Sequence, residues 1–184
     1  MNIRDVNTMV AGLIDEETID EYSNKIRGYY DAAQKQIATT VDFVNAEFEM
    51  NIGEPAEIDI EKYIKINFSK RIYKLCKILS DKAPTRVFGL KYNFSPGMYR
   101  IFCYVYPEDI TNSTPEDYEF EVSPEAQPAI AYYAAAKCVV TDSDQRPYYA
   151  FMDGYNNILQ NINDSRNKNT SINIVKIGGQ NNGI

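Results

Sequence analysis

The 184-residue sequence contains no histidine and no tryptophan, and it has only three cysteines. Histidine is the side chain that most often performs acid–base catalysis near neutral pH, so carboxylates alone could serve here. Cys76, Cys103 and Cys138 are odd in number and widely spaced, which leaves neither a disulfide framework nor a CxxC metal pair. We interpret them as three small buried hydrophobic residues in a reducing compartment.

Long apolar runs and clustered basic residues are also absent. No window approaches the roughly 18 uncharged apolar residues that span a bilayer, and the N-terminus lacks the apolar segment of a secretory signal. The net charge is −7, and none of the 19 basic residues forms a run of three. Because phosphate contacts need clustered Lys and Arg, we expect neither direct gripping of nucleic acid nor docking on an anionic membrane. An acidic surface that faces DNA without holding it remains compatible.

The carboxylates occur as adjacent pairs, and each pair falls at a predicted helix start or turn. These pairs are Asp15-Glu16, Asp20-Glu21, Glu108-Asp109, Glu116-Asp117 and Asp142/Asp144. Helix capping and solvation account for such positions, whereas a glycosidase needs two carboxylates that face each other across a cleft. No phosphate loop is present either. We therefore predict no catalytic, cofactor-binding or metal-binding residues, and a protein that is not an enzyme.

Apolar residues at helical spacing predict about four helices, over residues 3–14, 16–45, 124–140 and 145–162. The third is apolar almost all round, which is typical of a helix buried on most sides. Its small residues allow close approach of a neighbouring helix. The fourth has one apolar stripe, and its opposite face is polar, as expected of a helix that packs on the third.

Residues 51–122 carry frequent Gly and Pro between short runs of Ile, Tyr, Phe and Val, the pattern of an antiparallel β-region. Met98–Tyr106 is apolar on nearly both faces and predicts a central strand. We expect Arg71–Leu79 and Arg86–Phe94 to be its neighbours. Tyr118–Val122 alternates strictly and predicts a half-exposed strand.

Residues 163–184 form a predicted C-terminal tail. It has a polar loop, a strand-like run at 171–177 and a Gly- and Asn-rich end, and its net charge is +2 against −9 for the rest. A lone strand needs a sheet edge, which either its own domain or a neighbouring molecule could offer. The candidate assembly interface is Arg166, Lys168, Ile172, Ile174, Val175, Lys176 and Ile177.

The predicted fold class is α+β. It consists of a single domain over residues 1–162, a bundle of about four helices with the β-region inserted, followed by the extended tail 163–184. Fifteen tyrosines are present, and those outside the helical stripes enrich the predicted β-region. Tyr is favoured at protein interfaces, which is mild support for assembly with other proteins.

Three stretches, in this order, resemble the head-to-tail adaptor (connector) proteins in the neck of tailed bacteriophages. The first runs from Tyr22-Ser23-Asn24 to Thr39, and the second from Pro96-Gly97-Met98 to Thr111. The third runs from Pro124-Glu125-Ala126 through Asp142-Ser143-Asp144 to Phe151-Met152-Asp153-Gly154-Tyr155. Together they cover about three quarters of the chain, as loose patterns of apolar and small residues.

The resemblance implies a structural virion protein that forms a homo-oligomeric ring, usually a dodecamer, beneath the portal. The ring continues the channel through which DNA passes without specific binding. The implied partners are the portal protein, further copies of the chain and the next neck or tail protein, with no cofactor and no membrane. The chain would be made in the host cytoplasm and built into the virion neck, and its tail would reach the portal or a neighbouring subunit.

Two alternatives remain open. Another neck ring component, such as a stopper or tail-completion protein, would be dominated by β-structure. A Tyr-rich module that binds a ligand or carbohydrate would be a monomer.

Overall fold

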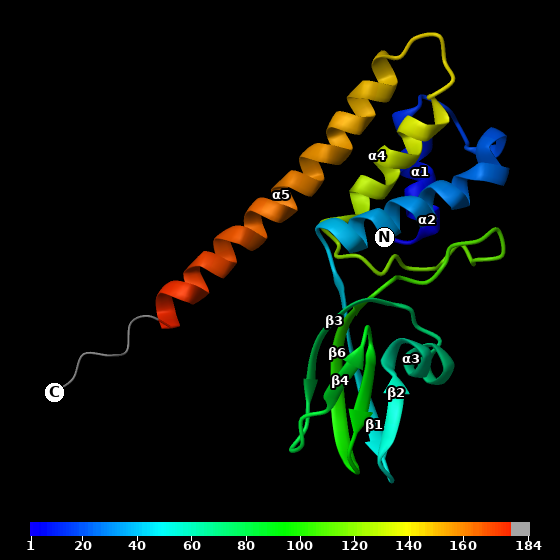
Figure 1. Cartoon of the computed structure of the whole chain (residues 1–184). Helices are drawn as coiled ribbons and strands as arrows, with labels where there is room; N and C mark the ends of the chain where they lie inside the picture. Colours follow the sequence, from blue (N-terminus) through cyan, green and yellow to red (C-terminus); the bar gives the residue numbers. More distant parts are fainter. Residues whose placement is uncertain (178–184) are drawn as a thin grey trace. The chain divides into compact units, whose positions relative to one another are not determined.

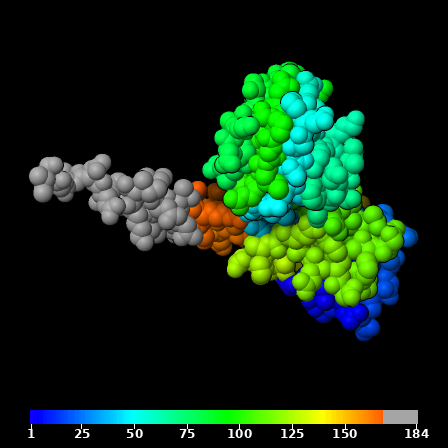
Figure 2. All heavy atoms as spheres, turned by 90° about the horizontal axis from the view of Figure 1, so that it is seen from below, coloured from blue at the N-terminus to red at the C-terminus, as the bar shows by residue number. Residues whose placement is uncertain are grey.

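A computed structural model describes the backbone of residues 1–177 and the side chains of residues 1–167. The chain divides into two compact units (Figure 1, Figure 2). The helical unit consists of Met1–Asp42 and the chain from Asp109 onward, and the β unit consists of Phe43–Glu108. The β unit is therefore an insertion into the helical unit.

The helical unit is built around one buried helix. Its elements are α1 (Ile3–Leu13), the short 3-10 turn η1 (Asp20–Tyr22), α2 (Ser23–Thr40), α4 (Gln127–Cys138) and α5 (Arg146–Ile177). Helices α1, α2 and α5 all contact α4. Ile130, Ala131 and Ala134 of α4 are fully buried, which confirms that this apolar helix is covered on most sides.

Helix α1 is held at its N-terminus by two sets of contacts. Asn2 and Asp5 form a capping box, in which the Asp5 amide donates to Asn2 Oδ1 at 3.0 Å and the Asn2 amide donates to Asp5 Oδ2 at 2.9 Å. The amides of Ile3 and Arg4 donate to the carbonyl oxygens of Tyr118 and Glu116, each at 3.1 Å. The helix thus satisfies amides that have no partner within it, because the segment before α4 runs past its start.

The β unit contains two three-stranded antiparallel sheets, in the orders β1-β6-β3 and β2-β5-β4. Its elements are β1 (Val44–Ile52), β2 (Ala56–Asp59), α3 (Ile60–Phe68), β3 (Ile72–Leu79), β4 (Thr85–Phe88), β5 (Lys91–Phe94) and β6 (Gly97–Val105). The chain passes between the sheets four times, once through α3 and three times at a proline, which are Pro55, Pro84 and Pro96. Proline has no amide hydrogen, so the hydrogen-bonded ladder breaks at each of these three points.

The β unit has a core of its own. Alternate residues of β6, such as Tyr99, Ile101 and Cys103, face inward with Met50 of β1 and Ile64 of α3. Strand β6 lies between β1 and β3, which confirms the central strand predicted at Met98–Tyr106. The segment predicted to lie beside it at Arg86–Phe94 is instead the β4–β5 hairpin of the second sheet.

The predicted bundle of about four helices with an extended tail is wrong. The described part of the chain has five α-helices and two small sheets, and the β unit has a separate core that a decorated bundle would lack. Helix α3 escaped prediction because its nine residues lie between strands, and two turns are too short to establish a helical period.

Several boundaries also differ from the sequence-based expectation. The helix expected over 16–45 begins at Ser23 and ends at Thr40, because strict alternation from Val44 to Ile52 forms β1. The strand expected at Tyr118–Val122 is reduced to one bridge between Asn2 and Glu119.

The predicted tail strand is also wrong, since α5 continues to Ile177. No Gly or Pro occurs between residues 155 and 177, so the polar stretch that was read as a loop contains nothing that ends the helix. The Gly- and Asn-rich segment at 178–183 lies outside the described residues.

Gly154 of α5 packs against the ring of Tyr132 of α4. A Cβ atom at this position would lie 2.7 Å from Cδ1 and Cε1 of Tyr132. We predict that Gly154→Ala lowers the free energy of unfolding by about 1–3 kcal/mol, because the ring must move or the helices must separate. In a Tyr132→Ala background the same change should instead stabilise the protein by about 0.5–1 kcal/mol through helix propensity.

Urea denaturation of the four variants measures both effects. Gly28→Ala in α2 is the matched control, because a Cβ there meets no atom within 4 Å. If Gly154→Ala proves as harmless as Gly28→Ala, the close α4–α5 contact does not constrain the fold.

Candidate assembly surfaces

Arg166, the first residue of the predicted assembly interface, is used inside the helical unit. Its guanidinium donates to the carbonyl oxygen of Val41 and to Oδ1 of Asp42. Asp42 is only 5% exposed, and its other oxygen accepts a hydrogen bond from the amide of Ser123. One carboxylate therefore joins the end of α2, the segment before α4 and the far part of α5.

The backbone of the remaining predicted interface residues is helical rather than extended as far as Ile177. The side chains of this group lie outside the described residues. They are Lys168, Ile172, Ile174, Val175, Lys176 and Ile177.

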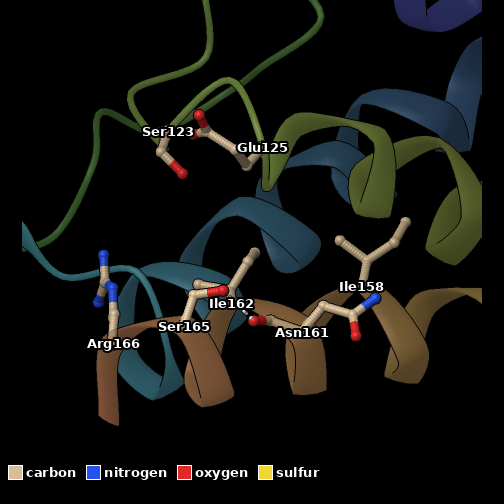
Figure 3. A pocket seen from close by; sticks show the side chains of 7 residues that line it. All are labelled: Ser123, Glu125, Ile158, Asn161, Ile162, Ser165 and Arg166. Atoms are coloured by element: carbon tan, nitrogen blue, oxygen red, sulfur yellow. Dashed lines mark hydrogen bonds between the residues drawn. The ribbon is translucent and has the colours of Figure 1, made fainter. Parts of the chain in front are cut away.

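A groove of about 560 Å³ lies beside Arg166. Figure 3 shows Ile158, Ile162 and Arg166 on α5, with Ser123 and Glu125 on the opposite wall. The lining mixes two aliphatic side chains with hydroxyl, carboxylate and guanidinium groups. Such a surface suits a protein segment with one apolar face, and it contains no arrangement of groups for bond-making chemistry.

Carboxylates of α2 also hold the returning chain after the β unit. Lys35 Nζ lies 2.6 Å from Asp31 Oδ2 and 2.6 Å from Asp109 Oδ1, and Asp31 Oδ1 accepts from the Ile110 amide at 2.9 Å. Burial alone would lower the pKa of Lys35, but its hydrogen bonds to Asp109 and Asp31 outweigh burial and raise that pKa. The return of the insertion is thus held by α2, whereas Asp42 at its exit is held by α5 and by the segment before α4.

A second polar cluster joins α1, α2 and the segment before α4. Glu116 pairs with Arg27 and accepts from Asn7 Nδ2 at 3.1 Å, and the Tyr30 hydroxyl donates to Asn7 Oδ1 at 2.7 Å. Burial raises the pKa of Tyr30 well above its usual range. Among these described groups, Nη1 of Arg27 is buried without a hydrogen-bond partner, and the other polar atoms named here bond to one another. We assign the cluster to the fold.

Basic residues are concentrated in the β unit. The search for runs of three consecutive basic residues did not reveal this concentration. The β unit has ten basic and eight acidic residues, a net charge of +2, whereas the rest of the chain has a net charge of −9. Residues 70–105 alone hold eight basic residues and one acid, Asp81. A charge count over a 36-residue window would have found this asymmetry.

The outer face of sheet β1-β6-β3 is partly aromatic. The rings of Phe43 and Tyr104 stack with centroids 4.7 Å apart, and Tyr73, 40% exposed, stacks on Phe43 at 6.2 Å. A hollow of about 400 Å³ lies beside them and includes Phe102 and Cys76. The tyrosines predicted to enrich this region are only partly surface residues, and Tyr118 belongs to the helical unit.

The three cysteines do not share one environment. Cys103 and Cys138 are buried, and burial raises the pKa of their thiols to about 11 and about 12. Cys76 is exposed on β3, so its predicted burial is wrong. Bulges in the pairing of β3 with β6 shift the alternation there, which a count of apolar residues cannot anticipate.

Among the described side chains, no group of three or more Cys, Asp or Glu residues is placed to hold a metal ion. Within residues 1–177, no helix combines the length and the apolarity that crossing a membrane requires. No protein-family model and no curated protein sequence matches this chain.

We predict that Asp42→Ala lowers the free energy of unfolding by about 1–3 kcal/mol, because it leaves the partly buried Ser123 amide without its acceptor and Arg166 without its carboxylate. Glu47→Ala is the matched control. It removes an exposed carboxylate from a pair with Arg100 at 3.4 Å, and its unfolding midpoint should not change measurably. Equal effects of the two substitutions in urea denaturation would contradict this assignment.

Proposed function

We propose that this protein is a structural subunit of the neck of a tailed bacteriophage particle. In this proposal several copies form an adaptor ring beneath the portal protein and continue the DNA channel toward the next neck or tail protein. The resemblance of three ordered stretches supports it. Those stretches fall on α2, on β6 with the chain that follows it, and on the packed pair α4 and α5.

The observation that carries the proposal is the length of α5. It has 32 residues against 12 in α4, or about 48 Å against about 18 Å. In the described part of the chain, α4 is the only helix or strand with which α5 makes extensive contact. Figure 1 shows α5 running on well past the end of α4.

The far part of α5 is polar and exposed where its side chains are described. Asn161 and residues 163–167 are exposed, and the guanidinium of Arg166 contacts Val41 and Asp42 of the same unit. A polar helix without a partner is marginally stable in water, so packing against another molecule would stabilise it. A helix that extends beyond its own unit can reach a neighbouring subunit or the portal.

Charge is consistent with a wall along a DNA channel. The helical unit has a net charge of −9, and a surface of that sign repels the phosphate backbone. DNA can then pass without being held.

Quantitative mass spectrometry of purified particles, and of necks isolated from them, tests the proposal directly. We expect the chain in both samples, at a fixed ratio to the portal protein that corresponds to several copies per particle. Its absence from intact infectious particles would overturn the proposal.

The contacts of Arg166 define where a truncation should be made. We predict that a chain ending at Asn167 keeps the unfolding midpoint of the full chain, because Arg166 still reaches Asp42, yet fails to join heads to tails in a complementation assay. A chain ending at Ile162 should also lose about 1–3 kcal/mol of stability. If the chain ending at Asn167 supports normal particle yield, the end of α5 is not the attachment device.

A further inference from the structure

The β4–β5 hairpin exposes apolar surface to an unusual degree. Phe88 is 81% exposed and Val87 is 49% exposed, and every residue of β4 is exposed. Strand β4 is also an edge of its sheet, since the described residues place β5 on one side and no strand on the other. Exposed apolar edge strands tend to pair with other chains. An edge strand of this kind therefore indicates an interaction site.

The hairpin is rigid at its tip. Phe88 lies directly opposite Lys91, and the two residues between them form the turn. Gly89 has a φ of +58°, which this kind of two-residue turn requires and which glycine adopts without strain. Arg86 Nε donates to the Gly89 carbonyl oxygen at 2.9 Å and braces the turn. The backbone that carries Phe88 is therefore held in a defined turn, which reduces the backbone entropy lost on binding.

The charge around this apolar tip is positive. Residues 80–91 include Lys82, Arg86 and Lys91 against one acid, Asp81. A matching partner surface would be acidic with a small apolar recess.

The helical unit of the same chain has a surface of this kind. A groove of about 490 Å³ lies between α1 and η1, within the usual range of about 300–1,000 Å³ for binding pockets. Its apolar and small lining includes Ala11, Gly12 and Ile19, and its acids are Glu16, Glu17 and Asp20. No basic residue occurs between residues 11 and 22. A Cβ on Gly12 would meet nothing within 4 Å, so the recess is open there.

We propose that the β4–β5 hairpin of one copy docks into the α1–η1 groove of another copy. Phe88 enters the recess, and Arg86 and Lys91 face Glu16, Glu17 and Asp20. The two surfaces differ, so each copy offers one of each, and the contact can repeat from copy to copy until a ring closes. This docking would be the contact between neighbouring subunits of the proposed ring. It rests on the proposed function only for the premise that copies associate.

A nucleic acid is the other partner that positive charge could indicate. A protein binds a nucleic-acid strand through many cations along a groove and through aromatic rings on which the bases stack. Here the most exposed groups at the tip are Phe88 and Val87, with only Arg86 and Lys91 adjacent in the strands. The balance of apolar and charged surface favours a protein partner.

Photo-crosslinking of the full chain tests the contact. Phe88 is replaced by benzoylphenylalanine, and this chain is mixed at high concentration with an isotope-labelled copy that has the natural sequence. After irradiation we expect peptide links from position 88 to residues 11–20 of the labelled copy. The same probe at Tyr149, an aromatic residue of α5 that is 63% exposed, is the control and should give no link to residues 11–20.

Charge-reversal variants test whether the crosslink depends on the proposed pairing of opposite charges. Glu16→Lys with Glu17→Lys should lower the yield of the link about tenfold, the equivalent of one decade in affinity. Asp153→Lys, an exposed reversal on α5, should leave the yield unchanged. Lys91→Glu in the probe-bearing chain, which preserves the bond between Arg86 and Gly89, should restore part of the yield toward the reversed groove.

Several results would overturn the inference. They are links confined within one chain, links to a different surface, no link at any concentration, and a link to added duplex DNA in place of the groove. The proposed function stands apart from these outcomes. Particles can contain the chain while position 88 fails to link, and copies can link through the hairpin although the chain is absent from particles.

Discussion

The structure depends on two carboxylates that hold the two ends of the β insertion in the helical unit. Where the chain leaves α2, Asp42 bonds to Arg166 of α5 and to the Ser123 amide before α4. Where the chain returns, Asp31 of α2 accepts a hydrogen bond from the Ile110 amide. Inserting a separately folded unit into a helix pair requires its two ends to be held, because free ends would separate the segments that build the helical core. These buried or half-buried contacts supply that constraint.

Arg166 also bears on the proposed attachment. It binds Asp42, and it lies in a part of α5 whose described side chains are mostly exposed. In the proposed function, the first part of α5 packs on α4 and stabilises the helical unit, and its last part attaches to another molecule.

Charge is divided between the two units rather than spread evenly. The β unit has a net charge of +2, and the helical unit has a net charge of −9. The proposed docking between copies uses this asymmetry, because each copy offers one positive and one negative surface. In that proposal the two surfaces are the exposed hairpin with Phe88 and the acidic groove beside Gly12.

The sequence by itself determined the buried helix α4, the central strand β6 and the start of α1, since apolar period and capping residues are local signals. It did not reveal α3, the exposure of Cys76 or the continuation of α5, where short length, bulges and a polar composition obscured the period. Only the tertiary structure decided that Arg166 binds Asp42 and that the lysines of residues 70–105 belong to one unit. Periodicity states which face of an element is covered, but the covering partner comes from contacts between residues far apart in the chain.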